Sequence, residues 1–375
     1  MKNIKIKLIL ICFVCFVSCV LKDESKNENS IIVIDIANTI NKKGNKISYL
    51  NDISQDIRLI PIETNDSILF KHVNIEGITE EYIVAHDGNI GVNKIAVYLI
   101  NKNSGKVASI IDRRGQGPGD YLRIANVFVN TKDNTIFLSD NVKINEYTFD
   151  GKFIKSIKND SIDALRILSD DNFAVSFSPL VNQDYALGIY DKSWVLKRKS
   201  IPKLKIKEKF DMVYFDAIFN FNNDFFYKLA HSDTLYRFTS EFDEPYLVHS
   251  KGRYTIPFDI KANREMTEKY GNRYVQYDFG YLISKYYFLT YYYNNKFYSE
   301  IWNIEESSLL FKSIYGRDGR HPGIPVIIGE EIINVWPSYV KNNYLYCIIE
   351  NEDALKIMPS LPEDTNPIIL EVKLK

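Results

Sequence analysis

Short apolar runs that alternate with polar residues recur along most of the chain. From about residue 51 to the C-terminus, turns containing Asp, Asn and Gly separate these runs. Alternation with a period of two is typical of β-strands, because successive side chains of a strand point to opposite faces of the sheet. The pattern therefore predicts an all-β fold.

A unit of two strands joined by a short polar turn repeats within this pattern. Its six copies begin at Val97, Ile144, Leu187, Asp233, Tyr298 and Asn366. The first four starts lie 47, 43 and 46 residues apart, which is close to the length of a four-stranded propeller blade. The sequence predicts a six-bladed β-propeller of four-stranded antiparallel blades with a short helical insertion.

The insertion is expected in the first of two long gaps between copies, which span 65 and 68 residues. Residues 260–274 (IKANREMTEKYGNRY) have helix-forming composition and no strand alternation. The second gap contains five prolines, and we expect extended loops there. A seventh, degenerate blade is an alternative explanation of the long gaps.

A propeller must close its ring, because an open first or last blade leaves an unpaired strand edge. The last copy ends at the C-terminus with an apolar strand at residues 368–374, so no partner strand can follow it. Residues 56–63 (DIRLIPIE) form an alternating strand ahead of the first full blade. We expect this strand to pair with the C-terminal blade as an edge strand, a position that tolerates Pro61.

The first residues of the chain have a different pattern. Lys2, Lys5 and Lys7 precede an unbroken apolar run at residues 8–17. A basic segment followed by an apolar run of this length is typical of a secretory signal, and the run is too short to span a bilayer. We therefore expect an exported protein with a signal peptide at residues 1–18.

The signal ends in a cysteine. Residues 16–19 (FVSC) resemble the lipobox of bacterial lipoproteins, with Phe16 in place of the usual leucine. The resemblance implies lipidation of Cys19 and a membrane partner reached through the lipid anchor, in the outer membrane. Cleavage elsewhere, as in an ordinary signal peptide, is the alternative.

A polar segment without apolar periodicity follows Cys19, and it predicts a flexible tether. Its Lys-Asp-Glu at residues 22–24 resembles the short acidic signal that sends Bacteroidetes lipoproteins to the cell surface, although a solvated tether explains these residues equally well. The expected organisation is a lipidated tether and lead-in at residues 19–50 and a propeller at residues 51–375.

Cysteine usage and charge narrow the function. Cys12 and Cys15 are expected to be removed with the signal peptide, so Cys347 is the one cysteine besides Cys19. No disulfide framework is therefore possible. Cys347 lies in a buried-strand pattern and is expected in the core. Removing residues 1–18 takes away three lysines and no acid, which changes the formal net charge from −1 to −4. This balance argues against a nucleic-acid partner.

The most distinctive stretch is DRRGQGPGDY at residues 112–121, directly after the first copy. With residues 136–141 (IFLSDN) and 144–153 (INEYTFDGKF) it resembles an NHL-type propeller repeat, without the proline that often follows the loop. Together with the lipobox and the strand IPIE at residues 60–63, the loop resembles the six-bladed β-propeller lipoproteins of Bacteroidetes. The resemblance covers most of the mature chain.

A related loop, RDGRHPG at residues 317–323, follows the fifth copy, and four residues of the first loop match residues 204 positions later. Glycine and proline suit a chain that leaves an outer strand and turns sharply toward the axis. Both loops are interpreted as crossovers between blades. Alternatively, their N–H groups and arginines form an anion-binding concavity on one propeller face. The candidate ligand-binding residues are Arg113, Arg114, Gly115, Gly117, Gly119, Tyr121, Arg317, Gly319, Arg320 and His321.

Enzyme motifs are missing from the chain. It has no nucleophile elbow, zinc-binding HExxH, phosphate-binding loop or CxxC pair. The five histidines are scattered, and His86 with its neighbour Asp87 is interpreted as part of a hairpin turn rather than a metal site. No catalytic residue, metal or cofactor is assigned.

Two function classes remain. The first is a binding or scaffolding lipoprotein whose loops engage a glycan, a peptide or a partner protein. A tyrosine-dense region at residues 286–298 could stack sugars, although core packing also explains it. The second is a propeller lyase or hydrolase with an axial metal, by analogy of fold. That class requires three or more Asp, Glu, Asn or His side chains from different blades at one axial opening.

Lipidation at Cys19 is directly testable. The variant Cys19→Ala should lose labelling by a radioactive fatty acid and should be released from membranes, because the thiol is the site of acylation. Metabolic labelling followed by membrane fractionation measures both effects. Labelling of the variant at the level of the wild type would contradict the prediction.

Overall fold

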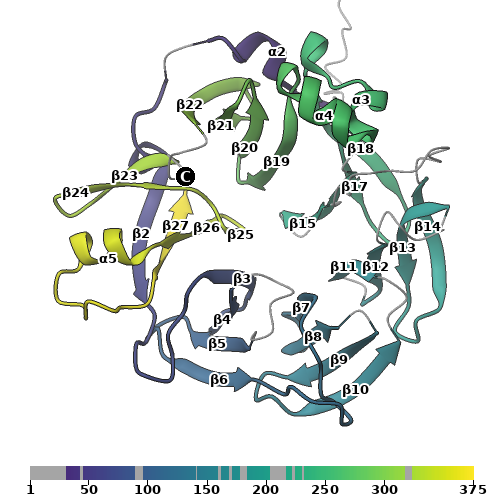
Figure 1. Ribbon diagram of the computed structural model, residues 1–375, viewed down its shortest axis with the longest axis vertical. Helices are drawn as coiled ribbons and strands as arrows, with labels where there is room; N and C mark the ends of the chain where they lie inside the picture. The colour runs from purple at the N-terminus through teal and green to yellow at the C-terminus, as the bar shows by residue number, and fades with distance from the viewer. Residues whose placement is uncertain are drawn as a thin grey trace, which may run out of the picture. The chain divides into compact units, whose positions relative to one another are not determined.

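The computed structural model describes residues 31–375 except 43–44, 89–95, 141, 159–161, 169–170, 178–183, 203–216, 222–223, 230–231 and 317–322. Its strands form six antiparallel blades around a central axis (Figure 1). The predicted six-bladed propeller is confirmed.

The first three blades follow one another along the chain. Blade 1 contains β3 (Val73–Ile78), β4 (Tyr82–Asp87), β5 (Val97–Asn101) and β6 (Val107–Ile111). Blade 2 contains β7 (Asn126–Asn130), β8 (Thr135–Ser139), β9 (Lys143–Thr148) and β10 (Phe153–Lys158). Blade 3 contains β11 (Ile162–Ile167), β12 (Phe173–Phe177), β13 (Tyr185–Tyr190) and β14 (Leu196–Pro202).

The other three blades complete the ring. Blade 4 contains β15 (Ala217–Phe221), β16 (Asp224–Lys228), β17 (Thr234–Phe238) and β18 (Asp243–Ser250). Blade 5 contains β19 (Gln276–Ile283), β20 (Tyr286–Tyr293), β21 (Lys296–Asn303) and β22 (Ser308–Gly316). Blade 6 contains β25 (Tyr339–Lys341), β26 (Tyr344–Ile349), β27 (Ile368–Leu374) and, at its outer edge, β2 (Ser54–Pro61).

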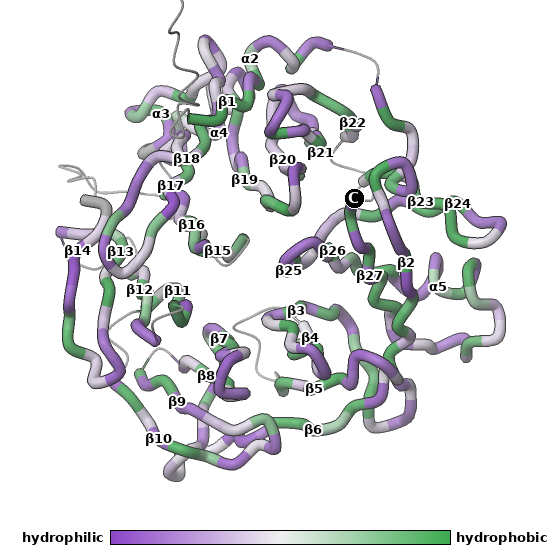
Figure 2. The backbone as a smooth tube through the Cα atoms, turned by 180° about the vertical axis from the view of Figure 1, so that it is seen from behind, coloured by the Kyte–Doolittle hydropathy of each residue, from purple (hydrophilic) through white to green (hydrophobic). Residues whose placement is uncertain are grey.

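Burial explains why some strands are continuous apolar runs in the sequence. All residues of β8 and β12 are buried, because neighbouring blades cover both faces of the middle strands. The outermost strand β10 is mostly exposed or half-buried. Figure 2 shows hydrophobic segments recurring in the strands of every blade. The core therefore consists of layers between adjacent blades, such as the cluster that joins Val84 and Leu99 of blade 1 to Val127 and Leu138 of blade 2.

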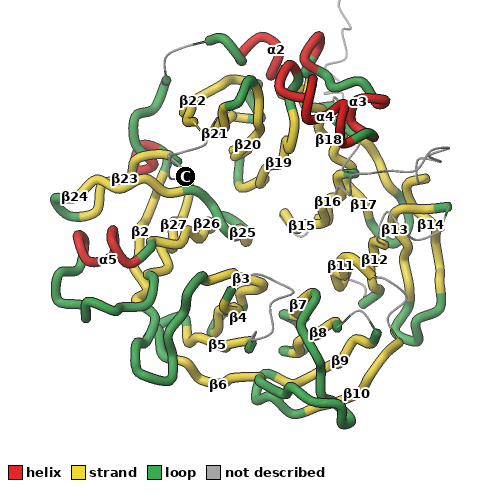
Figure 3. The backbone as a smooth tube through the Cα atoms, in the orientation of Figure 1, coloured by secondary structure: helices red, strands yellow, loops and turns green. Residues whose placement is uncertain are grey.

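The predicted helical insertion is present between blades 4 and 5. It consists of η2 (Gly252–Tyr254), α3 (Phe258–Ala262), α4 (Arg264–Tyr270) and η3 (Gly271–Arg273). Asn263 ends α3 and begins α4, where its side chain accepts a hydrogen bond from the N–H of Met266 at 2.9 Å. Figure 3 shows α3 and α4 grouped with α2 (Ile36–Thr39) at one edge of the ring.

Two expectations about the C-terminal part were wrong. The proline-containing gap holds a hairpin of β23 (Ile324–Ile328) and β24 (Glu331–Val335) and the helix α5 (Asn351–Ile357) rather than only loops. The copy that begins at Asn366 contributes a single strand, β27, rather than a hairpin. The two-stranded sheet of β23 and β24 is not a seventh blade.

The predicted ring closure is confirmed. Strand β2 pairs antiparallel with β27, with Arg58 opposite Glu371 and Pro61 opposite Ile368. Pro61 lies on the outermost strand of blade 6, a position in a sheet that tolerates proline. The first and last parts of the propeller are therefore joined within one sheet.

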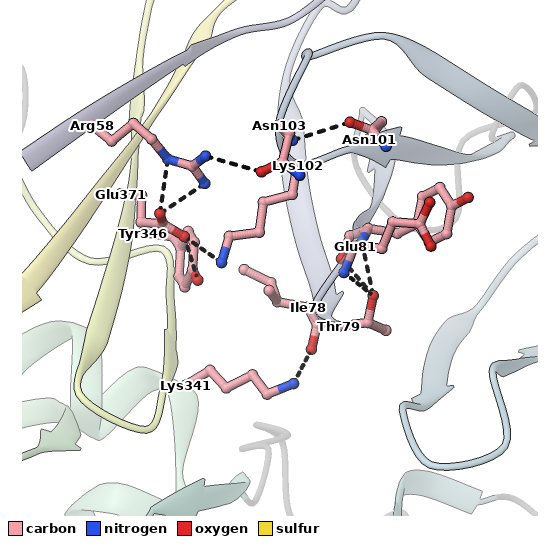
Figure 4. Close-up of polar contacts among 11 residues, drawn as sticks. Arg58, Ile78, Thr79, Glu81, Asn101, Lys102, Asn103, Lys341, Tyr346 and Glu371 are labelled. Atoms are coloured by element: carbon pink, nitrogen blue, oxygen red, sulfur yellow. Dashed lines mark hydrogen bonds and ion pairs between the residues drawn. The ribbon is translucent and has the colours of Figure 1, made fainter.

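A buried carboxylate connects the closing blade to blade 1 (Figure 4). Glu371 accepts hydrogen bonds from Arg58 Nε at 2.9 Å and from the Tyr346 hydroxyl at 2.8 Å. Lys102 lies in the turn after β5, and its Nζ is 2.7 Å from Oε2 of Glu371. Burial opposes the charge of Glu371, but Lys102, Tyr346 and Arg58 outweigh it and lower its pKa.

The N-terminal segment follows the outside of three blades. Strand β1 (Ile32–Asp35) adds to the outer edge of blade 4, parallel to β18. The Nζ of Lys312 in β22 donates to the carbonyls of Thr39 and Ile40 at 2.6 and 2.9 Å. The 3₁₀ helix η1 (Leu50–Asp52) precedes β2 on blade 6. The folded unit thus begins at Ile32, within the expected lead-in, and residues 20–30 of the expected tether lie outside the described residues.

Strand direction divides the loops between two faces of the propeller. In every blade the first strand starts, and the fourth strand ends, at the same face. This crossover face carries the connections between blades and the turns between second and third strands. The opposite turn face carries the other turns. In the described part of the chain, no helix is long and apolar enough to cross a membrane.

The contacts of Glu371 predict its effect on stability. The variant Glu371→Ala should lower the free energy of unfolding by about 2 kcal/mol, because two cations and a buried hydroxyl lose their acceptor. Urea unfolding followed by circular dichroism measures the change. Glu352→Ala is the control, because its exposed ion pair with Lys356 in α5 should contribute at most about 0.5 kcal/mol. Equal stability of the two variants would contradict the prediction.

Candidate functional site

A polar pocket of about 340 Å³ lies on the crossover face beside the helical insertion. Its walls come from α4, η3, the start of β19 and the hairpin between β20 and β21. The lining residues are Arg264, Thr267, Glu268, Asn272, Gln276, Tyr277, Tyr292 and Asn295. The pocket therefore combines two aromatic rings with amide, carboxylate and guanidinium groups.

Local sequence places the polar side chains around this pocket. Arg264 and Glu268 are four residues apart on α4, so they share one helix face. Asn294 and Asn295 have positive φ values of 50° and 59°, as required in a two-residue hairpin turn. The N–H of Asn294 donates to the carbonyl of Asn272 at 2.9 Å. This bond ties the hairpin of blade 5 to the helical insertion.

Tyr277 is the most unusual residue of the pocket. Its φ is +53°, and its side chain is 56% exposed. It lies where the pairing of β19 with β20 shifts register between Gln276 and Phe279, and such a bulge redirects side chains. The rings of Tyr277 and Tyr292 meet edge to face with centroids 6.5 Å apart. The bulge thus places an aromatic ring on one wall of the pocket.

The next residue, Asp278, points the other way into a buried ion cluster between blades 4 and 5. The cluster consists of Lys228, Asp233, His249, Lys251, Asp278 and Tyr287. The carboxylate of Asp278 lies 2.6 Å from His249 Nδ1, 3.0 Å from Lys251 Nζ and 3.3 Å from Lys228 Nζ. Burial alone would raise the pKa of Asp278, but these groups outweigh it and hold the pKa well below its usual value.

The cluster favours the neutral form of His249. Burial disfavours the imidazolium and lowers the pKa of His249, and the two lysines act in the same direction, although Asp278 opposes them. The neutral ring satisfies both nitrogens, with Nδ1–H donating to Asp278 and Nε2 accepting from the Tyr287 hydroxyl at 2.8 Å. Gly280 leaves room for Tyr287, because a Cβ there would lie 2.4 Å from the tyrosine ring.

The two lysines and two aspartates of the cluster balance one another. Lys251 bridges Asp278 and Asp233, at 3.0 and 2.6 Å, and the aspartates outweigh burial and raise its pKa. Lys261 of α3 lies close to these charges, and burial is the main reason that its pKa is lowered to about 8. The cluster therefore reaches from the two blades to the helical insertion that borders the pocket.

The predicted loop at residues 112–121 connects blades 1 and 2 on the same crossover face. The N–H of Gly117 donates to Asp120 Oδ2 at 3.0 Å, and a Cβ on Gly115 would lie 2.5 Å from the same oxygen. Asp120 of the loop itself thus occupies the concavity between these glycines. Arg114 Nε donates to the carboxylate of Asp112 at 2.8 Å.

Tyr121 and Gly119 hold this loop in place. Tyr121 is 1% exposed, and its hydroxyl donates to the carbonyl of Ile111 at 3.1 Å. Gly119 has φ +74°, and a Cβ there would lie 2.5 Å from the ring of Phe153. Arg113 Nε is 3.9 Å from Asp120 Oδ1. These contacts show a tightly packed crossover, and the role of its residues in ligand binding stays a prediction.

The second predicted loop lies mostly outside the described residues. This applies to Arg317, Gly319, Arg320 and His321, and also to Cys19, the predicted site of lipidation. Gly323, the last residue of the loop, is described and has a positive φ of 51°. Because β6 and β22 are both fourth strands, the two loops leave their blades on the same face.

Other predicted positions have structural contacts. His86 and Asp87 belong to strand β4 and not to a turn, and Asp87 Oδ1 accepts hydrogen bonds from the backbone N–H groups of residues 71 and 72. His86 Nε2 lies 3.0 Å from Glu76 of the same blade. Among the described residues, no three His, Cys, Asp or Glu side chains are grouped as a metal site would require.

The tyrosine-dense region belongs mainly to the core. Tyr286, Tyr287, Tyr291, Tyr292 and Tyr298 are each less than 9% exposed. The expectation of a core thiol is also confirmed, because Cys347 is free and completely buried. The exposed aromatic residue of blade 5 is Tyr277, which the sequence analysis did not select. Residues 276–279 (QYDF) alternate regularly between polar and aromatic side chains, so no signal in the sequence marked Tyr277.

The fold and the pocket define a six-bladed β-propeller with a polar recess on its crossover face. The chain belongs to the family described as "Domain of unknown function (DUF4934)", whose model matches residues 31–373. No curated protein matches the chain.

Two solved structures share this fold. A protein of Bacteroides fragilis NCTC 9343, described as exported, aligns with a TM-score of 0.68 at 17% identity and covers 92% of this chain and 100% of its own. A member of the duf4221 family from Bacteroides vulgatus ATCC 8482 aligns with a TM-score of 0.55 at 12% identity, covering 89% and 99%. At these identities the likeness concerns the fold.

The neutral His249 predicts a stability that depends on pH. Its folded pKa lies below the unfolded value of about 6.5, so the unfolded chain takes up a proton first as the pH falls. The free energy of unfolding should therefore fall below about pH 6.5, by up to about 1.4 kcal/mol per pH unit from this residue. Urea unfolding at several pH values from about 7.5 to about 5 measures the slope.

The variant His249→Gln should be less stable than the wild type near neutral pH. The slope of its free energy of unfolding against pH should correspond to about one fewer proton taken up on unfolding. His72→Gln, the same substitution at an exposed position of the crossover between blades 6 and 1, is the matched control because it leaves the buried cluster intact. An unchanged slope in His249→Gln would show that His249 does not stay neutral in the fold.

Proposed function

We propose that the protein is an exported lipoprotein, anchored in the outer membrane through Cys19, whose propeller binds a ligand at its crossover face. The observation that carries the proposal is the pocket beside the helical insertion, where exposed polar groups surround an exposed tyrosine ring. Concave sites with a few convergent polar groups on a rigid scaffold are the usual form of ligand sites. The description of the Bacteroides fragilis protein as exported agrees with the signal at residues 1–18.

The pocket is built on regular secondary structure, which favours binding of a ligand by side chains whose backbone is fixed. Arg264 and Glu268 are carried by α4, and Gln276 begins a strand of the sheet, so neither wall of the pocket depends on a long loop. Backbone held in helices and strands loses little conformational freedom on binding. A glycan, a peptide and a loop of a partner protein all present the polar groups that such a site contacts.

Binding can be tested with arrays of glycans and peptides and with extracts of outer-membrane proteins. The double variant Arg264→Ala with Glu268→Ala should weaken the interactions found for the wild type by about tenfold or more, because each lost charge-assisted hydrogen bond is worth about 1.5–3 kcal/mol. The matched control is Asp150→Ala with Lys152→Ala, an exposed ion pair on the turn face with 2.7 Å between Nζ and Oδ2. Equal binding by wild type and the Arg264 and Glu268 variant would contradict the proposed site.

A second double variant tests the arginine-containing loops. If Arg114 and Arg320 contribute to the ligand surface, replacing both with Ala should weaken binding of acidic ligands and leave neutral ones unchanged, since the loops offer cations and backbone donors. Unchanged binding of every ligand would show that the two loops act as crossovers only.

A further inference from the structure

The ring of Tyr277 is held in a position that a structural role does not require. The residue has φ +53°, a backbone conformation in which glycine is free of strain and a tyrosine is not. More than half of its side chain, 56%, is exposed, so little of the ring is used for core packing. Strained residues of this kind are concentrated at ligand sites, where the surrounding structure keeps them in place.

The neighbours of Tyr277 fix the direction of its ring. The preceding residue, Gln276, is 9% exposed, and the following residue, Asp278, is 8% exposed and bonded to His249 and Lys251. Tyr292 supports the ring from one edge at 6.5 Å, and the Tyr292 hydroxyl donates to Asn295 Oδ1 at 3.1 Å. The aromatic face is therefore placed before any ligand arrives.

Groups that both donate and accept hydrogen bonds surround the ring. Asn272, Gln276 and Asn295 contribute amides. The carboxylate of Glu268 is an acceptor, and the guanidinium of Arg264 is a donor. Sugar hydroxyls require this mixture, because each one donates and accepts. The C–H groups on one face of a pyranose ring carry positive partial charge and pack against the negative face of an aromatic ring.

The charge of the lining restricts the ligand further. Arg264 and Glu268 balance each other, and the other lining residues are uncharged. A phosphate, sulfate or uronate group would meet one cation and one anion and would gain little. A nucleotide or an acidic glycan therefore fits the pocket less well than an uncharged sugar.

We infer that this pocket binds a neutral oligosaccharide, with one sugar ring stacked on Tyr277 and its hydroxyl groups bonded to the amides of Asn272, Gln276 and Asn295. The inference rests on the proposed function and names the ligand class of the same pocket. The ligand is a short stretch of the oligosaccharide, since the recess of about 340 Å³ lies at the small end of ligand sites.

The test uses the full-length protein in detergent micelles and an array of neutral, sulfated and uronate-containing oligosaccharides. Isothermal titration calorimetry then measures the affinity for the best neutral oligosaccharide. Tyr277→Gly should weaken this affinity by about tenfold or more, while its melting temperature equals or exceeds that of the wild type because the backbone strain is relieved. A residue with only a structural role would show the reverse, a loss of stability without a specific loss of binding.

Two further variants sharpen the comparison. Tyr277→Phe keeps the ring and should bind within about threefold of the wild type. Phe242→Ala removes a similarly exposed aromatic side chain, 44% exposed, from the turn face and should bind as the wild type does.

Several results would overturn the inference. They are the absence of any saccharide binding, binding of acidic saccharides only, and unchanged saccharide binding by Tyr277→Gly. If peptides or proteins bind in a way that depends on Arg264 and Glu268 while no saccharide does, the saccharide inference fails and the proposed binding function stands. If no ligand depends on the pocket, both fail.

Discussion

The pairing of β2 with β27 is the interaction on which the rest of the structure depends. A propeller blade is stable only when both of its faces are covered, so a ring with one incomplete blade exposes apolar faces and an unpaired edge. Here residues from the two ends of the chain form a single blade, and Glu371 binds Arg58 of the closing strand and Lys102 of blade 1. Closure is thus a long-range contact that must form before the blades at either side of the junction are fully packed.

The same N-terminal segment also connects blades 4, 5 and 6 from outside. Strand β1 covers the edge of blade 4, and α2 is bound by Lys312 of blade 5, whose Nζ also lies 3.3 Å from the buried Glu300. The segment then reaches blade 6 as β2. The described part of this segment therefore enters the fold at the outer edge of blade 4.

The blades could be predicted because each of them repeats a local pattern, and the closure could be predicted because an alternating strand at residues 56–63 precedes the first full blade. Strand β1 was missed because four residues pairing parallel to a distant edge leave no periodic signal. The pocket was missed for a related reason. Its residues come from a helix, a bulge and a hairpin turn, and Tyr277 is one of 26 tyrosines until the register shift of β19 separates it from those in the core.

The bulge in β19 links the core to the crossover face. A left-handed backbone costs about 1–2 kcal/mol for a residue other than glycine. Asp278, the next residue, receives hydrogen bonds from His249 and Lys251, and bonds to charged groups contribute about 1.5–3 kcal/mol each. The contacts of Asp278 hold the residue next to Tyr277 in the core and so oppose a change in the bulge. Since His249 lies in blade 4 and Lys251 directly follows that blade, the position of Tyr277 in the pocket depends on how blades 4 and 5 pack against each other.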